Sequence, residues 1–189
     1  MKRLFALLCG FFCFAVTQIF TRIPLLAHFD FELSVIGLRA PYLMLLLPAF
    51  SAGLFEETGR FLFSKTALKH ADFKDAILFG LGHSLMEITY LFYTAGVFHG
   101  APLSLWAILE RMSATLFHMA SAVFMLEGVR RGNGIRTLLL AILFHGAFDL
   151  AAVFFVRMSV PIGEALLFAI AGFYFSMVVR KRALLKEAR

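Results

Sequence analysis

Long apolar runs alternate with short polar connections along the whole chain. Six runs stand out, and each is close to the roughly 17–25 residues that a helix needs to cross a bilayer. They cover about residues 4–20, 37–63, 76–98, 103–126, 135–156 and 162–179. Lipid offers the backbone no hydrogen-bond partners, and no alternating barrel pattern is present, so these runs should be helices. The pattern therefore predicts an all-α, polytopic membrane helix bundle of about six transmembrane helices.

The composition supports a membrane protein. Of the 189 residues, 61% are hydrophobic, whereas soluble domains hold about 45–50% apolar residues. We expect residues 1–189 to form a single integral membrane domain. Residues 1–20 fit either a short first helix or a signal-like segment. We expect a retained helix, because the apolar run continues to Phe20 without a clear small-x-small cleavage site.

Basic residues gather in alternate connections. They occur at residues 2–3, 65–74, 130–136 and 180–189, whereas the turn at 98–104 has no Lys or Arg. The positive-inside rule then places both termini in the cytoplasm. The formal charge of +6 thus reflects membrane topology, and we expect no nucleic-acid partner. We expect the chain to be a multi-pass protein of a bacterial plasma membrane.

Ionisable side chains also lie inside the predicted spans, where they are costly and mark a functional site by default. Counted from the nearest basic anchor or cytoplasmic turn, Glu56, Glu57, His83, His118 and His145 lie eight or nine residues deep. That spacing corresponds to about 12–14 Å at the helical rise. Four helices should therefore place a carboxylate and three imidazoles in one layer. The depth of this layer suggests access from the cytoplasmic side.

A second, deeper set of charges accompanies these histidines. Glu87 follows His83 by four residues, and Asp149 follows His145 by four, so each pair shares a helix face. Arg111 should neutralise Glu87 or Asp149 in this deeper layer.

The adjacent glutamates need separate roles. Neighbouring helical residues point about 100° apart, so Glu56 and Glu57 cannot both face one water molecule. Arg60 lies one turn further and can reach either carboxylate. One glutamate should pair with Arg60 while the other faces the histidines as a general base; the sequence leaves open which is which.

Four motifs in this order carry a family resemblance. They are Glu-Glu-Thr-Gly-Arg at 56–60, Gly-His-Ser-Leu-Met-Glu at 82–87, Glu-Arg followed by His within 110–118, and His-Gly-Ala-Phe-Asp at 145–149. The motif-bearing core, about residues 43–155, resembles the YhfC family of intramembrane proteases, related to PrsW and to the CAAX-processing and bacteriocin-processing (CPBP, or Abi) group. The resemblance implies an endopeptidase that hydrolyses a peptide bond in a membrane-associated peptide or protein.

The resemblance also implies roles for individual residues. Glu56 or Glu57 would activate water, His83 would assist, and His145 with Asp149 would stabilise the oxyanion. The residues that would support this set are Arg60, Glu87, Arg111 and His118. In this form the chemistry needs no metal.

Three alternatives remain open at the level of the sequence. In a zinc-dependent hydrolase, His83, His118 and His145 would bind Zn²⁺ and leave a position for water, with Glu57 as base. The same charges could serve a proton- or ion-coupled carrier. They could also stabilise a non-catalytic immunity or interaction protein of the membrane.

Overall fold

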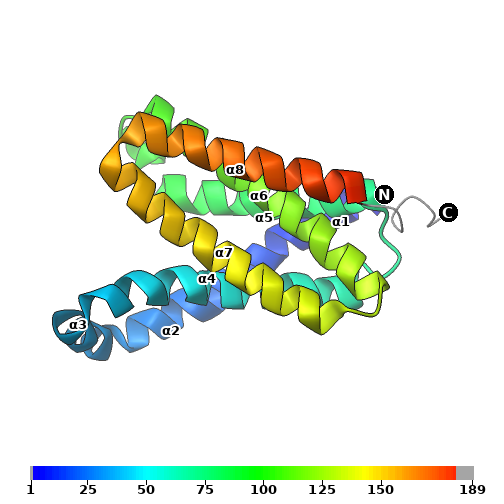
Figure 1. Cartoon of the computed structure of the whole chain (residues 1–189), viewed down its shortest axis with the longest axis horizontal. Helices are drawn as coiled ribbons and strands as arrows, with labels where there is room; N and C mark the ends of the chain where they lie inside the picture. The colour runs from blue at the N-terminus through cyan, green and yellow to red at the C-terminus, as the bar shows by residue number, and fades with distance from the viewer. Residues whose placement is uncertain (1, 182–189) are drawn as a thin grey trace.

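The computed structural model describes residues 2–181 as a bundle of helices, with no strand in this part of the chain (Figure 1). The elements are α1 (Lys2–Phe14), η1 (Ala15–Arg22), α2 (Ile23–His28), α3 (Asp30–Arg39), α4 (Pro41–Lys65), α5 (Phe73–Thr94), η2 (Val97–His99), α6 (Leu105–Arg130), α7 (Gly134–Met158) and α8 (Val160–Lys181). The predicted all-α class is confirmed. The basic residues predicted to matter at 182, 186 and 189 lie outside the described residues.

Five helical stretches are long and apolar enough to cross a membrane. They are the continuous stretch Lys2–His28 and the helices α5, α6, α7 and α8. The 25-residue helix α4 is equally long but is less apolar, because Glu56, Glu57 and Arg60 lie within it. The chain is thus a multi-pass membrane protein.

The second apolar run is divided differently from the prediction. It was expected to begin near residue 37, but α3 ends at Arg39 and α4 begins at Pro41. The residue before a proline avoids the helical region, and Ala40 adopts φ −141° and ψ 72°. Proline is well tolerated in the first turn of a helix, so Pro41 both ends the preceding segment and opens α4.

The two ends of the bundle have different contents. The start of α1 lies at the start of α5, where Arg3 binds Asp72 and Asp75. Val178 near the end of α8 joins the apolar cluster there, so α1 begins and α8 ends at the same end of the bundle (Figure 1). We call this end the terminal end, and the opposite end, which carries α3 and η2, the distal end.

Small residues pack the terminal half tightly. A Cβ atom on Gly82 would fall on the backbone oxygen of Leu7, so α5 and α1 touch backbone to backbone. Cys9 and Cys13 are free, buried thiols in this core. The other buried members of the cluster are Ala6, Leu68, Ala71, Ala76, Phe79, Ala120, Ala122, Val123, Leu126 and Val178. This packing leaves the terminal half closed.

Candidate active site

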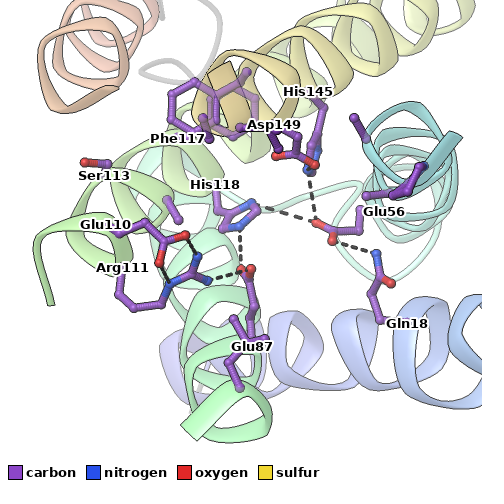
Figure 2. A pocket seen from close by; sticks show the side chains of 18 of the residues that line it. Gln18, Glu56, Glu87, Glu110, Arg111, Ser113, Phe117, His118, His145 and Asp149 are labelled. Carbon is purple, nitrogen blue, oxygen red and sulfur yellow. Dashed lines mark hydrogen bonds and ion pairs between the residues drawn. The ribbon is translucent and has the colours of Figure 1, made fainter. Parts of the chain in front are cut away.

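A cavity of about 570 Å³ opens from the middle of the bundle. Its polar inner part is lined by Gln18, Glu56, Glu87, Glu110, Arg111, His118, His145 and Asp149 (Figure 2). Its outer part is lined by residues nearer the distal ends of their helices, among them Ile23, Met44, Leu91, Val153 and Arg157. The cavity therefore extends toward the distal end.

The cavity extends away from the basic, terminal end, the side from which the sequence analysis expected access. The apolar core fills the terminal half, whereas α2 and α3 contribute no buried residue. These two short helices stand away from the rest of the bundle at the lower left of Figure 1. His83, His118 and His145 lie near the middle of their helices, and the cavity runs from them toward the distal end.

Glu56 is the meeting point of the predicted layer. It is 4% exposed, and its Oε2 accepts a hydrogen bond from His83 Nε2 at 2.8 Å. The same oxygen lies 3.9 Å from His118 Nδ1 and 3.8 Å from His145 Nε2. Helices α4, α5, α6 and α7 thus bring one carboxylate and three imidazoles together. Figure 2 shows the rings of His118 and His145 facing Glu56.

Glu57 points in the other direction. It is fully buried and does not line the cavity. Its carboxylate accepts hydrogen bonds from Ser121 Oγ at 2.7 Å and from His145 Nδ1 at 2.9 Å, and it also binds Arg60. Arg60 reaches Glu56 as well, at 3.1 Å. Of the two glutamates, Glu56 faces the cavity, and Glu57 pairs with Arg60 and His145.

The deeper charges form a network around Arg111. Its Nη1 donates to Glu87 Oε1 at 2.8 Å, and the guanidinium also binds Glu110 (Figure 2). His118 Nε2 donates to Glu87 Oε2 at 2.7 Å. The structure therefore pairs Arg111 with Glu87 rather than with Asp149. Asp149 Oδ2 instead lies 3.7 Å from His145 Nε2.

Two further groups next to the glutamates were missed in the sequence. Gln18 Nε2 donates to Glu56 Oε1 at 2.7 Å, and Arg22 Nη1 donates to Gln18 Oε1 at 2.9 Å. Gln18 lies in η1, a π-helical segment, and such segments are frequent at functional sites. The polar Thr17-Gln18 pair inside the first apolar run was the available signal. Ser121 has no comparable signal, because serine is common between packed membrane helices.

At the inner end of the cavity, the kinds of ligand atom and the distances between them suit a metal ion. Glu56, His83 and His118 each offer a ligand atom, and these atoms lie within 4.8 Å of one another. Two imidazoles and one carboxylate form a set that zinc hydrolases use. The predicted triad contained His145 in place of Glu56. Arg60 Nη2 lies 2.7 Å from His118 Nδ1, so a metal ion bound through that nitrogen would have to displace this hydrogen bond.

Comparison with known proteins identifies the family. The sequence model of a family described as YhfC intramembrane metalloprotease matches residues 3–99 and 97–163. These segments include all of the ionisable residues discussed above for the cavity. No curated protein and no solved structure matches the chain. The match covers most of the 189 residues, and the chain belongs to the YhfC family of intramembrane metalloproteases.

Proposed function

We propose that this protein is a metal-dependent intramembrane protease whose hydrolytic centre is the inner end of the polar cavity. The observation that carries the proposal is the position of Glu56, in contact range of three histidines from three other helices. Ionisable groups inside a membrane bundle are expensive and mark function by default. The family description, a metalloprotease, supports the same chemistry.

Glu56, His83 and His118 would hold the metal. A bound ion would polarise the carbonyl oxygen of the scissile peptide bond. Glu87 accepts the Nε2 proton of His118, which fixes the ring and leaves Nδ1 directed toward Glu56. With the metal bound, Arg60 would lose its hydrogen bond to His118 and keep its ion pair with Glu57.

His145 is placed to carry the proton. Its Nδ1 donates to Glu57, so in the neutral ring Nε2 is an acceptor, and this nitrogen lies 3.8 Å from Glu56 and 3.7 Å from Asp149. A carboxylate on one ring nitrogen orients the imidazole and stabilises its protonated form. His145 would take a proton from the attacking water and return it to the leaving amine. Asp149 would orient that water.

The substrate in this proposal is a membrane-associated peptide or protein that enters from the distal end. Leu45 and Ala152 line the outer part of the cavity. A cysteine introduced at Ala152 should react with a membrane-impermeant maleimide. A cysteine at the fully buried Val123 should not react. Equal reactivity at both positions would contradict access from the distal end.

A metal-free glutamate/histidine mechanism is the second candidate, because Arg60 already places a positive charge beside Glu56 and His118. In that case Glu56 would act as the general base, the fully buried His83 would hold its carboxylate, and His145, which lines the cavity, would polarise the carbonyl group. The buried residues would be the same in both mechanisms. Only the metal distinguishes them.

Metal content of the purified chain separates the two mechanisms without a known substrate. Wild type, His83→Ala, His118→Ala and the matched control His70→Ala, an exposed histidine, would be purified without chelator and checked for folding. The metal-dependent mechanism predicts about one zinc per chain in wild type and in His70→Ala, and its loss in the other two. Zinc-free, folded wild type would overturn the metal mechanism in favour of the metal-free one.

Proteolysis itself needs a separate measurement. Membranes from cells that express wild type or Glu56→Gln would be compared for new peptide termini. Termini that require Glu56 and fall within membrane-associated proteins would support a protease. Identical termini in both samples, with both proteins present at equal levels, would contradict it and favour a carrier or an interaction protein.

A further inference from the structure

A second cavity, of about 350 Å³, lies between α6, α7 and α8. It borders the polar cavity at two aromatic residues that line both spaces. Its lining is almost entirely hydrocarbon and aromatic, and the side chains Phe144, Ala147, Phe173 and Met177 border it. Phe144 and Phe173 are more than half exposed at the surface of the bundle. We call this cavity the α6–α8 groove. The groove therefore opens onto the apolar outer surface of the bundle.

Phe117 and Phe148 separate the groove from the polar cavity, since both residues line both spaces. Their rings stack with centroids 4.6 Å apart and planes 16° apart. Phe117 also contacts the ring of His145, with centroids 5.2 Å apart. The groove is therefore apolar because one aromatic layer shields it from the charges of the site.

The length and charge of the groove indicate its occupant. Along α8 its lining runs from Ile170 to Lys181, and the eleven helical steps between these two residues span about 16 Å. That length is close to half of the roughly 30 Å hydrocarbon thickness of a bilayer, which is the reach of one lipid chain in one leaflet. The charged end of the groove, at the terminal end of the bundle, holds Glu127 and Lys181. Glu127 is paired with Arg131 at 2.6 Å, so Lys181 and its neighbour Arg180 leave this end positively charged.

We propose that the α6–α8 groove binds one hydrocarbon chain of an anionic phospholipid, with the lipid phosphate at Lys181. Packing of the chain against phenylalanine rings supplies affinity through closer dispersion contacts, because a chain that comes from the bilayer leaves no water behind. The basic end supplies headgroup selection, because lysines at a membrane surface attract anionic lipids. This lipid site does not depend on the catalytic proposal.

The test uses the full chain in bilayer nanodiscs that contain a phospholipid with a photoactivatable group in one acyl chain, in anionic and zwitterionic forms. Labelled peptides are mapped by mass spectrometry. We expect labelling concentrated on the residues that line the groove, and stronger with the anionic lipid. The exposed face of α1, which carries Phe5 and Phe12, provides the reference for lipid that merely surrounds the protein.

Variants that fill the groove decide the proposal. Ala147→Phe and Ala151→Phe place a ring in the groove from α7 and should lower groove labelling about tenfold, the cost of losing roughly ten close carbon–carbon contacts. The matched control Ala169→Phe lies on the exposed surface of α8 outside the groove and should change nothing. Lys181→Gln should reduce the preference for the anionic lipid about fivefold while hydrocarbon labelling remains.

Three results would overturn the lipid site. Labelling spread evenly over α1 and the groove would indicate surrounding lipid only. Labelling unchanged in both groove-filling variants would place the lipid elsewhere. A dimer of the chain that is lost in Ala147→Phe and kept in Ala169→Phe would identify a second copy as the occupant.

Discussion

The terminal and distal halves of the bundle are built from different residues and do different things. The terminal half is packed from alanine, cysteine, glycine and a few large apolar residues, and it is closed. The distal half holds the polar cavity and the diverging helices α2 and α3. The comparison teaches that depth in the membrane and direction of access are separate properties. A site at mid-depth of the bundle can open toward one end alone.

The two adjacent glutamates mark the boundary between the halves. Glu57 faces the closed half, where Arg60 and Ser121 satisfy it. Glu56 faces the open half, where it lines the cavity. One residue along the helix thus changes a carboxylate from a buried structural partner to a group that a substrate can reach. Each prediction below tests one consequence of this division.

The largest effect is expected on the open side. Glu56→Gln keeps the size of the side chain and a hydrogen-bond acceptor but removes the charge. Proteolysis should fall by about 10²–10⁴-fold, measured as the rate at which new peptide termini appear in membranes. Glu32→Gln, on the exposed surface of α3, is the matched control and should be unaffected. Residual activity within about tenfold of wild type would remove Glu56 from the chemistry.

The next effect falls on the closed side and concerns stability. Arg60 is fully buried between Glu56 and Glu57, and Arg60→Gln leaves both carboxylates without their cation. Removing one partner of a buried ion pair costs about 3–5 kcal/mol, so the free energy of unfolding in mixed micelles should fall by that amount. The double variant Glu57→Gln/Arg60→Gln removes one of the two carboxylates left without a cation and should recover part of the loss. A double variant less stable than Arg60→Gln would contradict this pairing.

A smaller effect on activity is expected at the π-helical segment. Gln18 donates a hydrogen bond to Glu56 Oε1 and accepts one from Arg22. Gln18→Leu should lower proteolysis about 10–100-fold, as for other residues that orient a reactive group. Gln18→Glu places a second carboxylate at the same position and should lower it at least as much. Thr17→Val, one residue away and hydrogen-bonded only to its own helix, separates a local effect of η1 from the contact with Glu56.

The residues of the layer could be predicted because helical rise is constant and the basic anchors lie at one end. Counting residues from those anchors was therefore enough to group Glu56, His83, His118 and His145. The rotation of α4 about its axis is set by packing against η1, α6 and α7, so the sequence could not say which glutamate faces the histidines. The direction of the cavity depends on where α2 and α3 diverge, and no local pattern encodes that divergence. The start of the second apolar helix was expected near residue 37, four residues before Pro41, where α4 begins.

The smallest effect lies at the rim of the closed half, where Arg3 joins the start of α1 to the start of α5. Hydrogen bonding from Arg3 lowers the pKa of the Asp72 carboxyl from its ordinary 3.8 to about 2. A depressed pKa in the folded state stabilises the fold fully above about pH 4, and this stabilisation is lost as the pH falls through about 2. Exposed ion pairs contribute little, so Arg3→Gln should lower Tm by less than about 4 °C at neutral pH. Thermal unfolding in detergent from pH 7 downward should show the difference from wild type shrinking below pH 4. A difference that stays constant to pH 2 would assign the role of Arg3 to packing rather than to its charge.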